Sequence, residues 1–146
     1  AARNKQDFIY RNYEVETSGN PFVHGILRGY ETKTGAYRAN YHYEDLQLLL
    51  SLCYERNIDN LSIIIDCNHA NSNKHYLDQI RISKDVLQNK NNSRDIGKLV
   101  KGLMIESYIE DGAQMPHEHV YGRSITDPCL GWRKTEKLIY ELAEMI

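Results

Sequence analysis

The sequence of 146 residues lacks the long apolar run, about 18 residues, that a membrane-spanning helix needs. It also lacks a basic excess: 18 Lys and Arg residues face 20 Asp and Glu, so nucleic acid is not the expected partner. Only three cysteines occur, with no CxxC pair, which argues against a disulfide framework and favours a reducing compartment. The first seven residues are polar and carry no apolar core of a signal peptide. We therefore expect a cytoplasmic protein that binds neither a membrane nor nucleic acid.

What the sequence does contain is a short apolar run that ends in a cluster of polar residues, LSIIIDCNHANS at 61–72. Such a run predicts a strand buried on both faces, as in a parallel sheet. The polar cluster then lies at the carboxyl end of the strand, where α/β proteins bind their ligands. His69 is therefore a candidate metal ligand or catalytic group. The alternative is a structural histidine that hydrogen-bonds a neighbouring loop.

The rest of the chain alternates between predicted strands and helices. Strands are expected at 22–27, 61–66 and 99–105, after a hairpin at 7–17 and the end of a helix at 1–6. Helices are expected at 43–56, from a cap at Ser72 to about residue 88, and at 135–146, with loops at 30–41, 89–95 and 111–119. This order predicts an α/β fold with a parallel sheet and right-handed crossovers.

Charged residues follow the predicted strands, with Arg28 after the first, His69 after the second and Glu106 after the third. Because the carboxyl ends of parallel strands share one edge of the sheet, these three groups are expected to converge. Asp127 follows after a long loop and either joins them or caps a helix that Pro128 opens. One imidazole with carboxylates suits Mn, Fe, Co or Zn, and a guanidinium suits phosphate or carboxylate.

Each of these residues has an alternative reading. Arg28 could form a salt bridge at the rim of the sheet, and Glu106 could pair with Arg28 or a lysine. His117 and His119, in PHEHV, are spaced as in a metal-binding motif but are interpreted as solvated loop histidines. Cys67 is interpreted as a packed thiol.

Four stretches, SGNPFVHGILRG, IIIDCNHANSNK, GLMIESYIEDG and YGRSITDPCLGW, resemble the class I 3-deoxy-D-arabino-heptulosonate 7-phosphate (DAHP) synthases in order and spacing. The family motifs are LRGG, DxSHANS, a strand ending in VES, and GxSITDxCxGW. The resemblance implies a TIM barrel that condenses phosphoenolpyruvate with erythrose 4-phosphate, the first step of the shikimate pathway. It also implies that one divalent metal ion binds His69, Glu106 and Asp127, with His69 and Asp127 catalytic. Arg28 would bind the phosphate of phosphoenolpyruvate.

The chain departs from the family pattern at three places. The second glycine of LRGG is Tyr30, and the serine of SHANS is Asn68. The hairpin before the LRG strand lacks the family's TKWGH, which leaves open the aromatic amino acid that would act as feedback inhibitor. A synthase that uses another sugar phosphate is a further reading, and the ITDxCxGW motif argues against it.

The chain is expected to form a single partial barrel domain over residues 1–146. Residues 1–21 would hold the helix end and the hairpin, and residues 22–146 the last three βα units of the barrel. A TIM barrel has eight such units in about 250 residues, and the family motifs GPCS and KPRT are absent here. We expect the C-terminal portion of a homo-oligomeric enzyme, inactive alone. The alternative is a non-catalytic partial-barrel module that pairs with a separate N-terminal chain.

Overall fold

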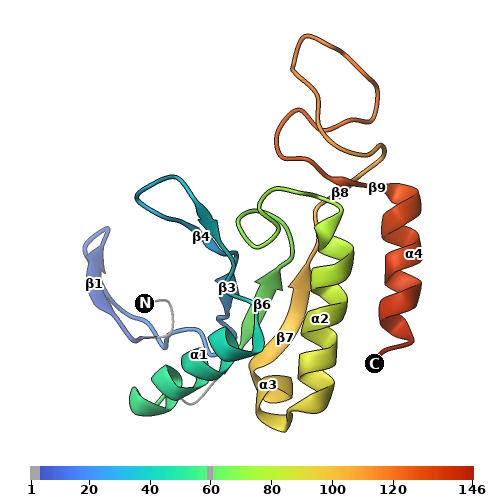
Figure 1. Ribbon diagram of the computed structural model, residues 1–146. Helices are drawn as coiled ribbons and strands as arrows, with labels where there is room; N and C mark the ends of the chain where they lie inside the picture. Colours follow the sequence, from blue (N-terminus) through green and yellow to red (C-terminus); the bar gives the residue numbers. More distant parts are fainter. Residues whose placement is uncertain (1–3, 59–60) are drawn as a thin grey trace.

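The computed structural model describes residues 4–58 and 61–146, and at its centre lies a parallel sheet with helices packed against it (Figure 1). The strands are β1 (Asp7–Tyr10), β2 (Tyr13–Glu16), β3 (Gly25–Leu27), β4 (Tyr30–Glu31), β5 (Tyr37–Arg38), β6 (Ile63–Asp66), β7 (Val100–Met104), β8 (Ser107–Tyr108) and β9 (Leu130–Gly131). The helices are α1 (Tyr43–Glu55), α2 (Asp78–Asn92), α3 (Arg94–Leu99) and α4 (Trp132–Ala143).

The central sheet has the strand order β3-β6-β7, and both pairings are parallel. Ile65 of β6 lies opposite Leu27 on one side and Leu103 on the other. Just beyond β7, the short strand β8 pairs in parallel with β9. The prediction of an α/β fold with a parallel sheet is confirmed. Because the strands run in one direction, the segments that follow them leave the sheet at the same edge.

Helices α1, α2 and α3 pack their apolar residues against β6 and β7. The apolar spacing of α1 buries Leu46 and Leu50, four residues apart, as the predicted helix at 43–56 requires. They share one core cluster with Ile65 and with residues of α2 and α3, among them Ile82 and Ile96. A second cluster joins α2 to β9 and α4, which lies beside α2 in Figure 1, through Leu87, Leu130, Leu138 and Leu142.

The predicted hairpin at 7–17 is confirmed as β1 and β2, joined by a two-residue turn at Arg11 and Asn12. Both residues have positive φ angles, of 49° and 65°, as a primed hairpin turn requires. A second, shorter hairpin of β4 and β5 occupies the segment predicted as a loop at 30–41, so that prediction is wrong. Its strands have only two residues each, too few for a periodic pattern to show.

The helix predicted to begin at a Ser72 cap begins instead at Asp78. His69, Asn73 and Lys74 have positive φ angles, which are incompatible with a right-handed helix through this segment. The Ser72 hydroxyl donates to Asn68 Oδ1 at 2.9 Å instead of capping a helix.

The prediction of a loop at 89–95 is also wrong, because α2 continues to Asn92 and α3 begins at Arg94. Ser93 caps α3 by accepting a hydrogen bond from the Ile96 N–H, and Ile96 and Leu99 are buried. In α2, Val86 and Leu87 are buried, and this packing outweighs the low helix propensity of the asparagines that follow them. The last helix begins three residues earlier than predicted, at Trp132, and ends at Ala143.

The N-terminal helix end predicted at 1–6 is not present in residues 4–6, and residues 1–3 lie outside the described part of the chain. Among the described residues, no helix combines the length and the apolar character needed to cross a membrane.

Replacing Leu46 with alanine is expected to lower the free energy of unfolding by about 2–5 kcal/mol, because the fully buried side chain leaves a cavity. Leu48, on the same helix, is 62% exposed, so Leu48→Ala should change stability by no more than about 0.5 kcal/mol. Urea unfolding followed by circular dichroism measures both variants. Equal losses would contradict the orientation of α1.

Candidate metal centre

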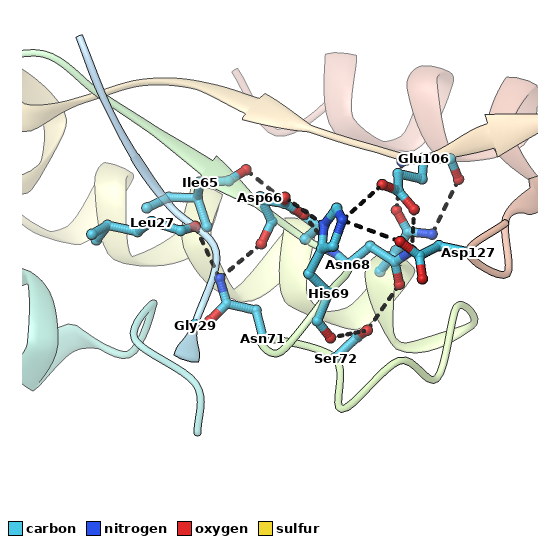
Figure 2. A network of polar contacts seen from close by, with 12 residues as sticks. Leu27, Gly29, Ile65, Asp66, Asn68, His69, Asn71, Ser72, Glu106 and Asp127 are labelled. Atoms are coloured by element: carbon cyan, nitrogen blue, oxygen red, sulfur yellow. Dashed lines mark hydrogen bonds and ion pairs between the residues drawn. The ribbon is translucent and has the colours of Figure 1, made fainter. Parts of the chain in front are cut away.

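Three side chains from different strand ends meet at the carboxyl edge of the sheet (Figure 2). His69 follows β6, Glu106 follows β7, and Asp127 precedes β9. His69 Nε2 lies 3.3 Å from Glu106 Oε1 and 3.4 Å from Asp127 Oδ2. One ligand atom from each residue lies within 4.8 Å of the others. The structure therefore brings together the three residues that the sequence analysis singled out for a metal.

The donor set of this triad fits a first-row divalent cation. It offers one imidazole nitrogen and two carboxylate oxygens, ligands that Zn, Mn, Fe and Co accept. The three side chains are partly exposed, at 19% for His69, 26% for Glu106 and 35% for Asp127. Three protein ligands at a solvent-accessible position leave coordination positions for water or substrate.

The His69 ring is held by Asp66, a carboxylate with 1% exposure at the end of β6. His69 Nδ1 lies 2.7 Å from Asp66 Oδ2. A proton on Nδ1 satisfies this carboxylate and leaves the Nε2 lone pair directed at Glu106 and Asp127. The His69 backbone has a φ of 46°, in the left-handed region that non-glycine residues adopt rarely. Such backbone conformations cluster at functional sites, and they also occur in turns such as that at Arg11 and Asn12.

Glu106 is held at both its backbone and its carboxylate. The buried Gln79 of α2 donates to the Glu106 carbonyl at 3.1 Å and accepts from the Glu106 N–H at 2.8 Å. Asn68 Nδ2 donates to Glu106 Oε2 at 2.6 Å. No lysine or arginine pairs with Glu106 in the part of the chain that the structure describes, so the alternative of a Glu106 salt bridge is wrong there.

Asn71 ties the ends of β3 and β6 together. Its Nδ2 donates to the carbonyl oxygens of Leu27 at 3.0 Å and Asp66 at 2.8 Å. Its Oδ1 accepts from the Asn40 N–H at 2.9 Å. The backbone that carries His69 is therefore fixed to the backbone that carries Arg28.

Arg28 follows β3 at the same edge and is exposed. It lines an open cleft of about 300 Å³ together with His69, Lys74 and Asp127. Across residues 4–58 and 61–146, no carboxylate forms a salt bridge with Arg28, so the alternative of a rim ion pair finds no support. Its guanidinium can therefore receive an anion in the cleft.

Lys74 is a residue of this cleft that the sequence analysis missed. Its Nζ lies 3.4 Å from Asp127 Oδ1 and 5.9 Å from the centre of the Tyr37 ring. The hydrogen bond to Asp127 is the largest cause of the raised pKa of Lys74. The only feature of the sequence that pointed to Lys74 was its place at the end of the stretch HANSNK.

The helix-cap reading of Asp127 is wrong, because α4 begins at Trp132 with Gly131 as its N-cap residue. His117 and His119 are exposed in the loop between β8 and β9, and within the described residues they belong to no cluster of metal ligands, consistent with solvated histidines.

Cys67 is fully buried next to Ser83, and burial raises the pKa of its thiol to about 12. A thiol with that pKa stays protonated and packs as a small apolar group. Its reading as a packed thiol therefore agrees with the structure. Cys129 is half-buried, and burial also raises its pKa.

Comparison with known proteins gives matches over almost the whole chain. Residues 2–139 match the model of the DAHP synthetase I family. The Trp-sensitive phospho-2-dehydro-3-deoxyheptonate aldolase of Escherichia coli (strain K12) is 33% identical, over 99% of this chain and 38% of that protein. The Trp-sensitive aldolase of Buchnera aphidicola subsp. Baizongia pistaciae (strain Bp) is 34% identical, over 99% of this chain and 39% of that protein.

A solved structure agrees with these matches. The phospho-2-dehydro-3-deoxyheptonate aldolase from Francisella tularensis SCHU S4 matches with a TM-score of 0.79 at 31% identity, covering 99% of this chain and 42% of that one. The chain thus spans about two fifths of the length of these relatives.

Replacing Gly29 with alanine is expected to destabilise the fold more than the same change at Gly35. Both glycines have positive φ angles, 70° and 83°, so each alanine costs about 1–2 kcal/mol. At Gly29 the new Cβ would also lie 2.7 Å from the Arg38 carbonyl oxygen and 2.8 Å from Ala70, whereas at Gly35 the nearest atom is 3.8 Å away. Urea unfolding of both variants gives the difference, and equal losses would argue against the close approach of Gly29 to Ala70.

Proposed function

Because this chain belongs to the DAHP synthetase I family, we propose that it is the C-terminal portion of a synthase that condenses phosphoenolpyruvate with erythrose 4-phosphate to DAHP. The observation that carries this proposal is the convergence of His69, Glu106 and Asp127, with ligand atoms within 4.8 Å of one another. The exposed Arg28 beside them supports an anionic substrate in the same cleft.

In this proposal, His69, Glu106 and Asp127 hold one divalent ion of Mn, Fe, Co or Zn, with His69 and Asp127 acting in catalysis. A bound ion of this kind supplies Lewis acidity, which polarises a carbonyl group or activates a water molecule. Asp66 keeps the His69 proton at Nδ1, so that Nε2 stays available as a ligand. Arg28 binds the phosphate of phosphoenolpyruvate through paired N–H donors.

Lys74 has an electrostatic role in the cleft. Its ammonium group, 3.4 Å from Asp127 Oδ1, offsets part of the negative charge that two carboxylates bring to the site. With Arg28 it lines the same cleft, so two cations flank the space in which an anionic substrate would lie.

We also propose that the chain forms part of a TIM-type barrel, which needs eight parallel strands to close. In the described residues the central sheet has β3 and β7 as its outer strands, and β8 and β9 form a separate pair, so unpaired strand edges remain in both sheets. An unpaired edge of this kind is a template on which a further strand can pair. The remaining strands would come from the rest of a longer chain. The second candidate, a non-catalytic module that pairs with a separate N-terminal chain, is supported by the same edges.

Feedback inhibition, assembly and location are also part of the proposal. The E. coli and Buchnera relatives are named Trp-sensitive, which supports feedback inhibition by an aromatic amino acid. Assembly into a homo-oligomer and a cytoplasmic location stay predictions of the sequence.

His69→Ala is expected to abolish binding of Co²⁺ while the chain stays folded. Its free energy of unfolding should fall by about 1–3 kcal/mol, because the buried Asp66 Oδ2 loses its partner. Titration of the chain with Co²⁺, followed by its visible absorption, measures the binding. His117→Ala removes an exposed loop histidine and serves as the matched control. Unchanged Co²⁺ affinity in His69→Ala would show that the ion binds elsewhere.

The 146-residue chain alone is expected to show no formation of DAHP from phosphoenolpyruvate and erythrose 4-phosphate, because the parallel strands β3, β6, β7, β8 and β9 of the described residues are fewer than the eight that close a barrel. A discontinuous assay of DAHP, with and without an added N-terminal portion of a family synthase, measures this. Activity that appears on mixing supports the enzyme. Binding of the two parts without activity supports the module, and turnover by the chain alone contradicts the prediction.

A further inference from the structure

Asn68 links three strand ends through one side-chain amide (Figure 2). It has 1% exposure and lies just after β6. Its Nδ2 donates to Glu106 Oε2 at 2.6 Å and to the Pro128 carbonyl oxygen at 3.1 Å. Its Oδ1 accepts from the Ser72 hydroxyl at 2.9 Å. Both amide hydrogens and one oxygen lone pair are therefore used within the protein.

The chemistry of the neighbours fixes the orientation of this amide. A carboxylate oxygen and a backbone carbonyl oxygen are both acceptors, so only the NH₂ group of Asn68 can face them. The Ser72 hydroxyl can donate to the opposite side. Rotating the amide by 180° would place three oxygens against one another in a buried position, at a high cost in free energy.

The bond to Oε2 decides which atom of Glu106 remains for a metal. At 2.6 Å it is a short, charge-assisted hydrogen bond. The other oxygen, Oε1, lies 3.3 Å from His69 Nε2, inside the triad. A glutamate carboxylate can ligate through one oxygen or two. The hydrogen bond from Asn68 occupies one lone pair of Oε2 and so favours ligation through Oε1. The Pro128 bond adds a link to the residue that directly follows Asp127.

We propose that Asn68 is a positioning residue: it holds Glu106 as a one-oxygen metal ligand and braces it to the segment that carries Asp127. This inference rests on the proposed metal site at His69, Glu106 and Asp127. These two hydrogen bonds join Asn68 to Glu106, 38 positions away in the sequence, and to Pro128, 60 positions away. No local element of structure could make the same connection.

The identity of the residue is what makes the brace possible. The family motif SHANS has a serine at this position. A serine hydroxyl has one hydrogen to donate, so it could not donate to both acceptors. Asparagine has two. The double link between Glu106 and the Asp127–Pro128 segment is therefore specific to the amide at position 68.

The test is a Co²⁺ titration of the 146-residue chain and of Asn68→Ala, with the dissociation constant and the d–d absorption per bound ion as readouts. Loss of an outer-shell partner typically weakens metal binding about 10- to 100-fold. We expect a loss of that size, together with a changed absorption at saturating Co²⁺, because a released Oε2 alters the coordination number. The absorption per bound ion counts only occupied sites, so a simple loss of folded protein would not move it.

Asn91→Ala is the matched control. It removes another asparagine whose Nδ2 donates to a backbone carbonyl, that of Met145, at the end of α2 and away from the triad. It should keep the wild-type affinity and spectrum. Where circular dichroism shows that Asn68→Ala does not fold, Asn68→Ser serves instead, because it retains a small polar group but only one donor.

The outcomes separate the inference from the proposed function. Wild-type affinity and spectrum in a folded Asn68 variant would overturn the positioning role and leave the metal site intact. Equal Co²⁺ binding by the wild-type chain and by His69→Ala would overturn the metal site, and the role of Asn68 with it. A weakened site with an altered spectrum in Asn68→Ala, and neither change in Asn91→Ala, supports the inference.

Discussion

The parallel pairing of β3, β6 and β7 is the constraint that places Arg28, His69 and Glu106 at one edge of the sheet. It directs three chain segments out of the sheet at one edge, so residues far apart in the sequence become neighbours. Side chains alternate between the faces of a strand, so a slip of one residue would turn each of them to the other face. Leu27, Ile65 and Leu103 stand side by side across the sheet and pack against the core, which holds the register.

A buried polar network converts this register into a defined site. Asp66, Asn68, Asn71 and Ser72 are almost fully buried, and each has hydrogen-bond partners inside the network. Buried polar groups are costly when one partner is lost, so the members of this network stabilise one another. The polar segment after β6 therefore acts as a rigid support. Lys74 belongs to this segment and Arg28 follows β3 beside it, and both side chains are exposed.

Patterns local in the sequence predicted the fold well where burial alone decides the structure. The apolar runs gave the three strands, and the spacing of Leu46 and Leu50 gave α1. The start of α2 was mispredicted because Ser72, a good helix cap, uses its hydroxyl within the site. The strand ends pointed to His69 and Glu106. Gln79 and the amide contacts of Asn68 could not be foreseen, because their partners lie 27 to 60 residues away and depend on the completed sheet.

The long sequence spans bridged by Asn68 also bear on the order of events during folding. Contacts between distant residues require the closure of large loops, whose entropy is lost before the contact forms. The backbone hydrogen bonds of helices α1 and α2 join residues four positions apart, so they close no large loop and can form early. The partner of Asn68 at Pro128 lies 60 residues further along the chain. The centre must therefore assemble late, after the segment carrying Pro128 has left the ribosome.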